Sequence, residues 1–199
     1  IADPVSSEAM VDALIGAGTS PDAAKLFTMA IVNKDVASTF IEVYGRGAIA
    51  AEANGPRRAL NIEGLAALDL RTFKPNGEAW NFNLRSDRNE ARALIDSKQP
   101  MWLIGSPPCT AFSLLNVGLN YPKMSREEVQ KRVQEGLVHL KFVCQMYRRQ
   151  HRRGKFFLHE HPSSALSWKT KPILRMLKLS GVEYEPGSTL RGAEAPAGQ

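Results

Sequence analysis

The chain has little cysteine and no long apolar run. Its 199 residues contain only two cysteines, Cys109 and Cys144, which excludes the disulfide framework of a small secreted domain and predicts a reducing, intracellular environment. No apolar segment approaches the roughly 18 residues that a membrane-spanning helix needs, so we expect no membrane partner. Residues 1–4 lack the basic and apolar parts of a secretion signal. Because the chain starts at Ile1 rather than at Met, it is expected to be a fragment.

Nothing in the composition indicates a disordered or repetitive protein. Hydrophobic residues make up 43% of the chain and charged residues 23%, and its length suits one domain with a real core. We expect a helical lead-in over residues 1–37 and a Rossmann-like domain over residues 38–186. Residues 187–199 accumulate glycine, alanine and proline, which predicts a flexible tail. The oligomeric state stays open.

Short apolar runs alternate with helical patterns within residues 38–186. Such alternation predicts an α/β fold with a mostly parallel sheet flanked by helices. The expected strands are residues 38–44, 65–70, 101–104, 156–158 and 182–185, and the expected helices are residues 48–58, 87–97, 125–153 and 172–179. The longest helix opens with a capping box formed by Ser125 and Glu128, and its periodicity points Cys144 inward.

Two of the expected strands end in residues that suit a cofactor. Ligands of an open parallel sheet collect at the carboxyl ends of its strands. Gly45 and Gly47 follow the first strand and fit either a backbone that approaches a cofactor closely or a plain tight turn. Asp69 ends the second strand, near the spacing of roughly 20 residues at which an acidic residue holds a ribose hydroxyl. A solvated aspartate explains Asp69 equally well.

The third strand leads into a cysteine on a rigid corner. Pro107 and Pro108 cannot extend a sheet, and they hold Cys109 in a defined direction. A nucleophile benefits from such fixing. The alternative interpretation makes Cys109 a small apolar filler at a strand end.

The fourth strand ends in three titratable groups, His159, Glu160 and His161. In one interpretation Glu160 is a proton donor or hydrogen-bond partner. In a second, both histidines bind zinc with Cys109, because alternation puts them on one face. The four-ligand spacing of a structural zinc site is absent, however, and we expect no metal. In a third, Cys109 and a histidine catalyse hydrolysis, although no oxyanion-loop signature accompanies them.

The net charge of +6 favours polyanionic partners where the basic residues are clustered. One such cluster lies at the C-terminal end of the 125–153 helix. Its arginines are Arg148, Arg149, Arg152 and Arg153. The helix macrodipole favours cations at this end whatever the function. The cluster is therefore either a contact for nucleic-acid phosphates or ordinary helix-end chemistry.

The residues around the cysteine resemble a known family. The segment 106–113, Ser-Pro-Pro-Cys-Thr-Ala-Phe-Ser, resembles the Pro-Pro-Cys-Gln-x-Phe-Ser motif of the DNA cytosine-5 methyltransferases, with Thr110 where that family usually has Gln. Residues 40–45 resemble its first strand and cofactor loop, and Glu160 resembles the Glu of its Glu-Asn-Val motif. The similarity spans residues 38–162. Both motifs are closer still to divergent methyltransferase-like segments of mobile-element polyproteins.

The resemblance implies a Rossmann-like methyltransferase fold that uses S-adenosylmethionine to methylate C5 of a cytosine flipped out of DNA. Cys109 would attack C6 as a thiolate, while Glu160 would engage N3 and the exocyclic amine. The cofactor-binding residues that it implies are Glu42, Tyr44, Gly45, Gly47, Asp69, Asn81 and Pro107. A nuclear location follows if the chain acts on DNA, and an RNA partner stays open.

The chain also departs from this family. Arg46 and Ala48 stand where loop glycines are expected. Asn81 or Asn83 occupies the region of an acidic adenine contact, and His161 replaces the Asn of the Glu-Asn-Val motif. No Gln-x-Arg-x-Arg motif, target-recognition region or closing cofactor motif is found, so the fold is expected to be truncated. The alternative function is a catalytically inactive Rossmann-like module of a mobile-element polyprotein that binds nucleic acid.

Overall fold

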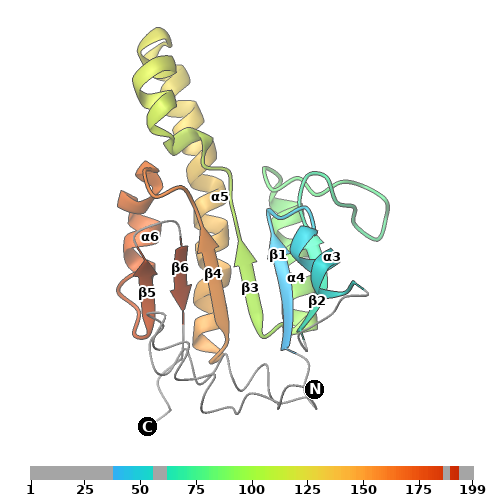
Figure 1. Ribbon diagram of the computed structural model, residues 1–199. Coiled ribbons are helices and arrows are strands. Elements are labelled where there is room, and N and C mark those ends of the chain that lie inside the picture. The colour runs from blue at the N-terminus through green and yellow to red at the C-terminus, as the bar shows by residue number, and fades with distance from the viewer. Residues whose placement is uncertain (1–37, 56–61, 186–188, 193–199) are drawn as a thin grey trace, which may run out of the picture.

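The computed structural model describes residues 38–55, 62–185 and 189–192, and in these residues six strands form one sheet (Figure 1). The strands are β1 (Ser38–Val43), β2 (Ile62–Leu68), β3 (Trp102–Gly105), β4 (Phe156–Glu160), β5 (Val182–Glu185) and β6 (Thr189–Gly192). Their order is β2-β1-β3-β4-β6-β5. The first four are parallel, whereas β6 runs antiparallel to β4 and β5. The expected α/β fold with a mostly parallel sheet and flanking helices is confirmed.

Helices cover both faces of the sheet. The α-helices in the described residues are α3 (Ala48–Ala53), α4 (Arg85–Lys98), α5 (Arg126–Arg152) and α6 (Lys171–Met176). The chain steps from β1 to β2 in one direction across the sheet and makes its later crossovers in the other. Because parallel crossovers are right-handed, α3 lies on one face and the later helices on the opposite one. Figure 1 shows α5 behind β4 and α3 in front of the sheet.

Short helical turns fill two of the connections. They are η1 (Thr110–Phe112), η2 (Asn116–Asn120, a π-helix) and η3 (Tyr121–Lys123) between β3 and α5, and η4 (Leu166–Lys169) after β4. None of the helices in the described ranges combines the length and the apolar character that crossing a membrane requires.

The core lies between the sheet and α5. The capping box that opens α5 is confirmed, because Ser125 Oγ accepts from the Glu128 N–H at 3.2 Å and Glu128 Oε2 accepts from the Ser125 N–H at 2.9 Å. One face of the helix is buried at helical spacing, and Leu140, Val143 and Tyr147 are at most 1% exposed. Burial of a large apolar side chain contributes about 1.5–3 kcal/mol, so this face holds α5 against the strands.

The structure corrects some element boundaries. β2 begins at Ile62 rather than at residue 65, because its pairing with β1 includes Glu63 and Gly64. These two residues interrupt the apolar pattern in the sequence. The first helix ends at Ala53 rather than at residue 58. Asn54 ends it by exchanging side-chain hydrogen bonds with the backbone of Gly64 in β2, at 2.8 and 3.0 Å.

The sheet also extends into the expected tail. Thr189–Gly192 forms β6, which pairs with β4 on one side and β5 on the other. Residues 187–199, predicted to be a flexible tail, therefore contain a strand of the sheet at Thr189–Gly192. The predicted helical lead-in, residues 1–37, lies outside the described residues.

Candidate functional site

The carboxyl ends of the four parallel strands lie in one row. Val43 pairs with Leu68 on one side and with Gly105 on the other, and Gly105 pairs with His159. The next residue of each strand emerges at the same edge of the sheet, with neighbouring strands about 4.8 Å apart. In strand order these residues are Asp69, Tyr44, Ser106 and Glu160. The direction of the crossovers reverses between β1 and β3, which marks this edge as the ligand-binding position of an open α/β sheet.

Glu42 supports the loop after β1 from within. The side chain is buried, and its Oε1 accepts a hydrogen bond from the Ala50 N–H, 2.8 Å away in α3. A Cβ atom on Gly45 would overlap Glu42 Oε2, so only glycine lets the loop fold over this carboxylate. Gly47 has a φ of 84°, the left-handed conformation that favours glycine, and precedes the first residue of α3. Both glycines shape a tight turn, and a cofactor role for them stays a prediction.

The side chain of Tyr44 turns away from the strand ends. Its φ of 63° is left-handed and breaks the alternation of β1. The hydroxyl bonds to His139 Nδ1 of α5 at 3.0 Å, and the ring meets Phe82 edge-on with centroids 5.0 Å apart. Burial raises the pKa of Tyr44 far above its usual value. The side chain thus anchors the loop to the helix layer, and only the backbone of Tyr44 lies at the predicted cofactor position.

Asp69 and Asn81 both use one side-chain oxygen to hold a local turn. Asp69 Oδ1 accepts from the Arg71 N–H at 3.1 Å, and Asn81 Oδ1 accepts from the Asn83 N–H at 3.1 Å. In the described part of the chain, no hydrogen bond uses Asp69 Oδ2. This half-buried carboxylate therefore keeps one acceptor atom at the strand edge.

The Pro-Pro-Cys corner is clamped to the end of β4. His161, 1% exposed, has its Nε2 2.6 Å from the carbonyl oxygen of Pro107 and its Nδ1 2.7 Å from Ser167 Oγ. Because a carbonyl only accepts, Nε2 carries the proton, and in the neutral ring Nδ1 accepts from the Ser167 hydroxyl. Burial lowers the pKa of His161, and this effect exceeds the increase that the hydrogen bond to Pro107 causes. The neutral imidazole thus joins β4 to the segment that presents Cys109.

A second buried group holds the end of β3. Tyr147 Oη lies 3.1 Å from the carbonyl oxygen of Gly105 and 3.1 Å from His159 Nδ1. The hydroxyl must donate to the carbonyl, so His159 Nδ1 donates to the hydroxyl. His159 Nε2 is then an unprotonated acceptor, and it is buried without a partner in the described residues. Burial, and secondarily His161, lower the pKa of His159 well below its usual value.

Cys109 is fixed from its other side as well. It precedes η1, and its carbonyl accepts from the Phe112 N–H at 2.8 Å. Phe112 is buried against Gly136 of α5, where an added Cβ atom would lie 3.1 Å from the ring. Cys109 itself is half-buried, and Glu160 is exposed at the end of the neighbouring strand. The structure therefore places a constrained thiol in the loop after β3 and an exposed carboxylate at the end of the neighbouring strand β4.

His161 supports neither the zinc nor the hydrolysis interpretation. His161 has both nitrogens engaged, so it has no free atom for a metal or for activating Cys109. Within the described ranges, no three His, Cys, Asp or Glu side chains form a group that could hold a metal ion.

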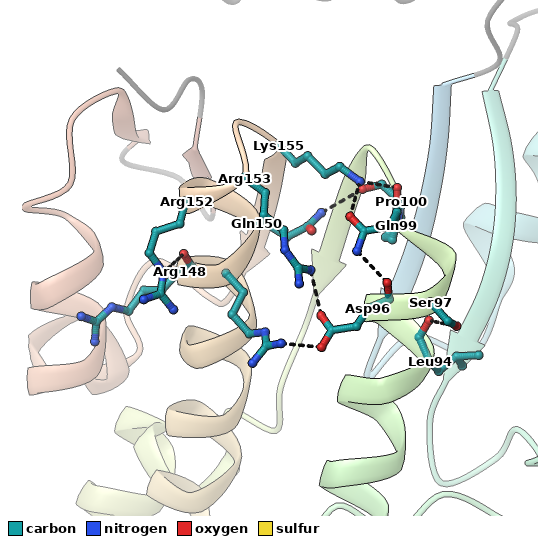
Figure 2. A network of polar contacts seen from close by, with 11 residues as sticks. Leu94, Asp96, Ser97, Gln99, Pro100, Arg148, Gln150, Arg152, Arg153 and Lys155 are labelled. Carbon is teal, nitrogen blue, oxygen red and sulfur yellow. Dashed lines mark hydrogen bonds and ion pairs between the residues drawn. The ribbon is translucent and has the colours of Figure 1, made fainter. Parts of the chain in front are cut away.

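The predicted phosphate contacts lie away from this edge. The basic cluster ends α5 just before Phe156, the amino end of β4, whereas Glu160 lies at its carboxyl end, about 13 Å along the strand. Arg149 forms an ion pair with Asp96 of α4, and Arg153 Nη1 lies 2.8 Å from the same carboxylate. Figure 2 shows that Arg148 and Arg152 extend to the other side of α5. The structure places the thiol and the carboxylate at the same edge of the sheet and leaves the arginines apart from both.

Sequence reasoning missed the residues that position the corner. The sequence patterns indicate a metal ligand or a base at His161 and give no role to Tyr147. The two side chains hydrogen-bond to the backbone carbonyls of Pro107 and Gly105, far along the chain, for which the sequence carries no signal. Gly105, directly before the corner, was a usable signal, because a glycine that closes a buried strand indicates the close approach of another element.

No protein-family model, curated protein or solved structure matches the chain.

Proposed function

We propose that the chain is an S-adenosylmethionine-dependent methyltransferase core that acts on C5 of cytosine in DNA. One observation carries the proposal: Cys109 lies on a corner that follows β3 and is clamped through His161, and the neighbouring strand β4 ends in Glu160. A nucleophile and an acid on neighbouring rigid strand ends are oriented before the substrate arrives. The resemblance of segment 106–113 to the cytosine-5 motif adds the substrate class.

Cys109 is the nucleophile of the proposed reaction, and Glu160 stabilises the charge that develops on the cytosine ring. The Cys109 thiolate adds to C6 of the flipped cytosine, and Glu160 holds N3 and the exocyclic amine, which draws charge out of the ring as the thiolate adds. The clamp at Pro107 keeps the thiol in one direction during this step. After C5 has taken the methyl group, solvent water accepts the C5 proton, the C5–C6 double bond re-forms and the Cys109 thiolate leaves C6.

The polar groups at the carboxyl ends of the parallel strands suit the binding of S-adenosylmethionine. S-adenosylmethionine supplies the methyl group when it is bound. Asp69, with Oδ2 unused by the described residues, would hold the ribose hydroxyls, and the backbone from Tyr44 to Gly47 would line the same crevice. Asn81 would contact the adenine through its amide nitrogen.

A second candidate function is a non-catalytic module with the same fold. It is favoured by the loop after β1, where Glu42 already binds the Ala50 N–H and Tyr44 already binds His139. A loop whose polar groups are satisfied within the protein leaves fewer of them for a cofactor. Such a module would keep the strand-end pattern because the fold needs it.

Two measurements separate these functions. Calorimetry with S-adenosylmethionine and its demethylated product, at millimolar ligand, tests the cofactor. DNA that carries 5-fluorocytosine tests the nucleophile. The fluorine at C5 cannot be removed as the C5 proton is, so the covalent adduct persists. Wild type and Cys144→Ser are expected to form the adduct in the presence of S-adenosylmethionine, whereas Cys109→Ser is not. If neither ligand binds, or if Cys109→Ser forms as much adduct as wild type, the methyltransferase proposal is wrong.

A further inference from the structure

A cavity of about 300 Å³ opens on the outer surface of α4 and α5. Its lining consists of Arg92, Gln145, Arg148, Arg149 and Arg152. Four of these five side chains are arginines, and the tertiary structure adds Arg92 of α4 to the three that lie close together in the sequence at the end of α5. No acidic residue lines the cavity.

The arginines of this cavity are only partly neutralised. Arg149 shares Asp96 with Arg153. Arg148 and Arg152 have no carboxylate partner among the described residues, and Figure 2 shows them directed away from Asp96. Arg152 Nε donates instead to the Arg148 carbonyl, at 3.3 Å.

Arg92 is bound to neutral groups. Its Nη atoms donate to Asn89 Oδ1 at 2.7 Å and to Gln145 Oε1 at 2.9 Å, and its guanidinium lies 5.1 Å from the centroid of the Phe142 ring. These contacts orient the group without cancelling its charge. Partial burial, followed by the nearby cations Arg88 and Arg149, lowers the pKa of Arg92.

We propose that this α4–α5 cavity binds a phosphate of a nucleic-acid backbone. Guanidinium groups match phosphate oxygens through paired N–H donors, which makes arginine the preferred side chain for such recognition. Arg148 and Arg152 lie one turn apart, so the positive surface continues along α5 and suits a chain of phosphates better than one isolated anion. The contacts are to the backbone and carry no base sequence.

The proposal is independent of the methyltransferase chemistry. The cavity lies near the amino end of β4, whereas Cys109 and Glu160 lie at the opposite edge of the sheet. Nucleic acid bound in the cavity therefore needs neither the thiol nor the cofactor. Binding in the cavity is expected to be unchanged without S-adenosylmethionine.

The test compares two triple variants that remove the same charge. Arg92→Gln/Arg148→Gln/Arg152→Gln changes the cavity, and Arg126→Gln/Lys131→Gln/Arg132→Gln changes exposed residues at the far end of α5. Affinity is measured by fluorescence anisotropy with labelled single-stranded DNA, duplex DNA and RNA of one sequence. The salt concentration is varied from about 50 to about 300 mM, because the slope of affinity against salt reports the counterions released by phosphate contacts. Circular dichroism checks that each variant is folded.

The cavity variant is expected to bind about tenfold more weakly and to show a salt slope smaller by about 2, since each phosphate contact contributes roughly 0.9. The control variant is expected to stay within about threefold of wild type. Equal losses in both variants would show a net-charge effect alone and overturn the proposal, as would binding of inorganic phosphate without any of the three nucleic acids. If the triple variant does not fold, Arg148→Gln/Arg152→Gln, which changes two exposed side chains, replaces it.

Discussion

His161 donates a hydrogen bond from Nε2 to the carbonyl oxygen of Pro107, 2.6 Å away. The bond ties the end of β4 to the corner that follows β3, two residues before Cys109. Because Ser167 fixes the other ring nitrogen, the imidazole has one tautomer and one orientation. The clamp makes the direction of the thiol depend on a histidine that touches no substrate in the proposed reaction, so His161 is a positioning residue.

Removal of the clamp is expected to destabilise the fold. His161→Ala leaves the buried Pro107 carbonyl without its donor, which costs about 1–3 kcal/mol in the free energy of unfolding. Asn at this position carries an amide N–H₂, so His161→Asn is expected to recover part of the loss. Urea denaturation measures both variants. Equal stability of the Ala variant and wild type would contradict the clamp.

The end of β3 is expected to require glycine. A Cβ atom at residue 105 would overlap Tyr147 Oη and lie 2.8 Å from Val143 Cγ2, so Gly105→Ala should lower the free energy of unfolding by about 1–3 kcal/mol. Gly118→Ala is the matched control, since a Cβ atom there meets nothing within 4 Å. Its expected change is within about 0.5 kcal/mol. Thermal unfolding of both variants distinguishes a packing effect from a general intolerance of alanine.

The two thiols are expected to react at very different rates. Cys144 is 4% exposed, and burial raises its pKa to about 12, whereas Cys109 is half-buried. Since the thiolate is the reactive form, a disulfide reagent should modify one thiol in the native protein and two after denaturation. Cys109→Ser should lose the native reaction. Labelling of Cys144 in that variant before unfolding would contradict the burial.

Stability is expected to fall in mild acid. The pKa values of His159 and His161 are lowered from 6.5 in the fold, chiefly by burial. The unfolded chain therefore takes up protons first as the pH decreases. The part of the free energy of unfolding that depends on keeping these two histidines neutral is fully present above pH 6.5 and is lost as the pH falls below it. Urea denaturation from pH 8 to pH 5 should show this loss for wild type and a shallower one for His159→Phe, with about one proton fewer linked to unfolding. An unchanged slope would mean that His159 does not contribute.

Asp96 is expected to limit the charge of the α4–α5 cavity. Asp96→Asn releases Arg149 and Arg153, so affinity for single-stranded DNA should rise severalfold. Stability should fall by no more than about 1 kcal/mol, because these ion pairs are partly exposed. Glu127→Gln, exposed in the first turn of α5, makes the same change in net charge and should raise affinity less. Anisotropy titrations at one salt concentration compare the two.

The strands and the long helix were predictable because their signals are local. The alternation of apolar runs gave β1, β3, β4 and β5 to within a residue or two, and the Ser125 capping box gave the start of α5. β6 was not predictable, since Thr189–Gly192 is a strand only through its pairing with β4 and β5. The same holds for the end of α3, which Asn54 fixes through β2.

The local sequence is enough to identify the residues that can do chemistry: a cysteine behind two prolines, a carboxylate at the next strand end and a basic helix terminus. Their arrangement in space follows from the fold. Strand register put Cys109 and Glu160 at one edge, His161 and Tyr147 fixed the corner through backbone carbonyls, and the crossing of α4 and α5 joined Arg92 to an arginine pair far along the chain. The physical reason is that burial and register depend on contacts between distant segments, which no local pattern encodes.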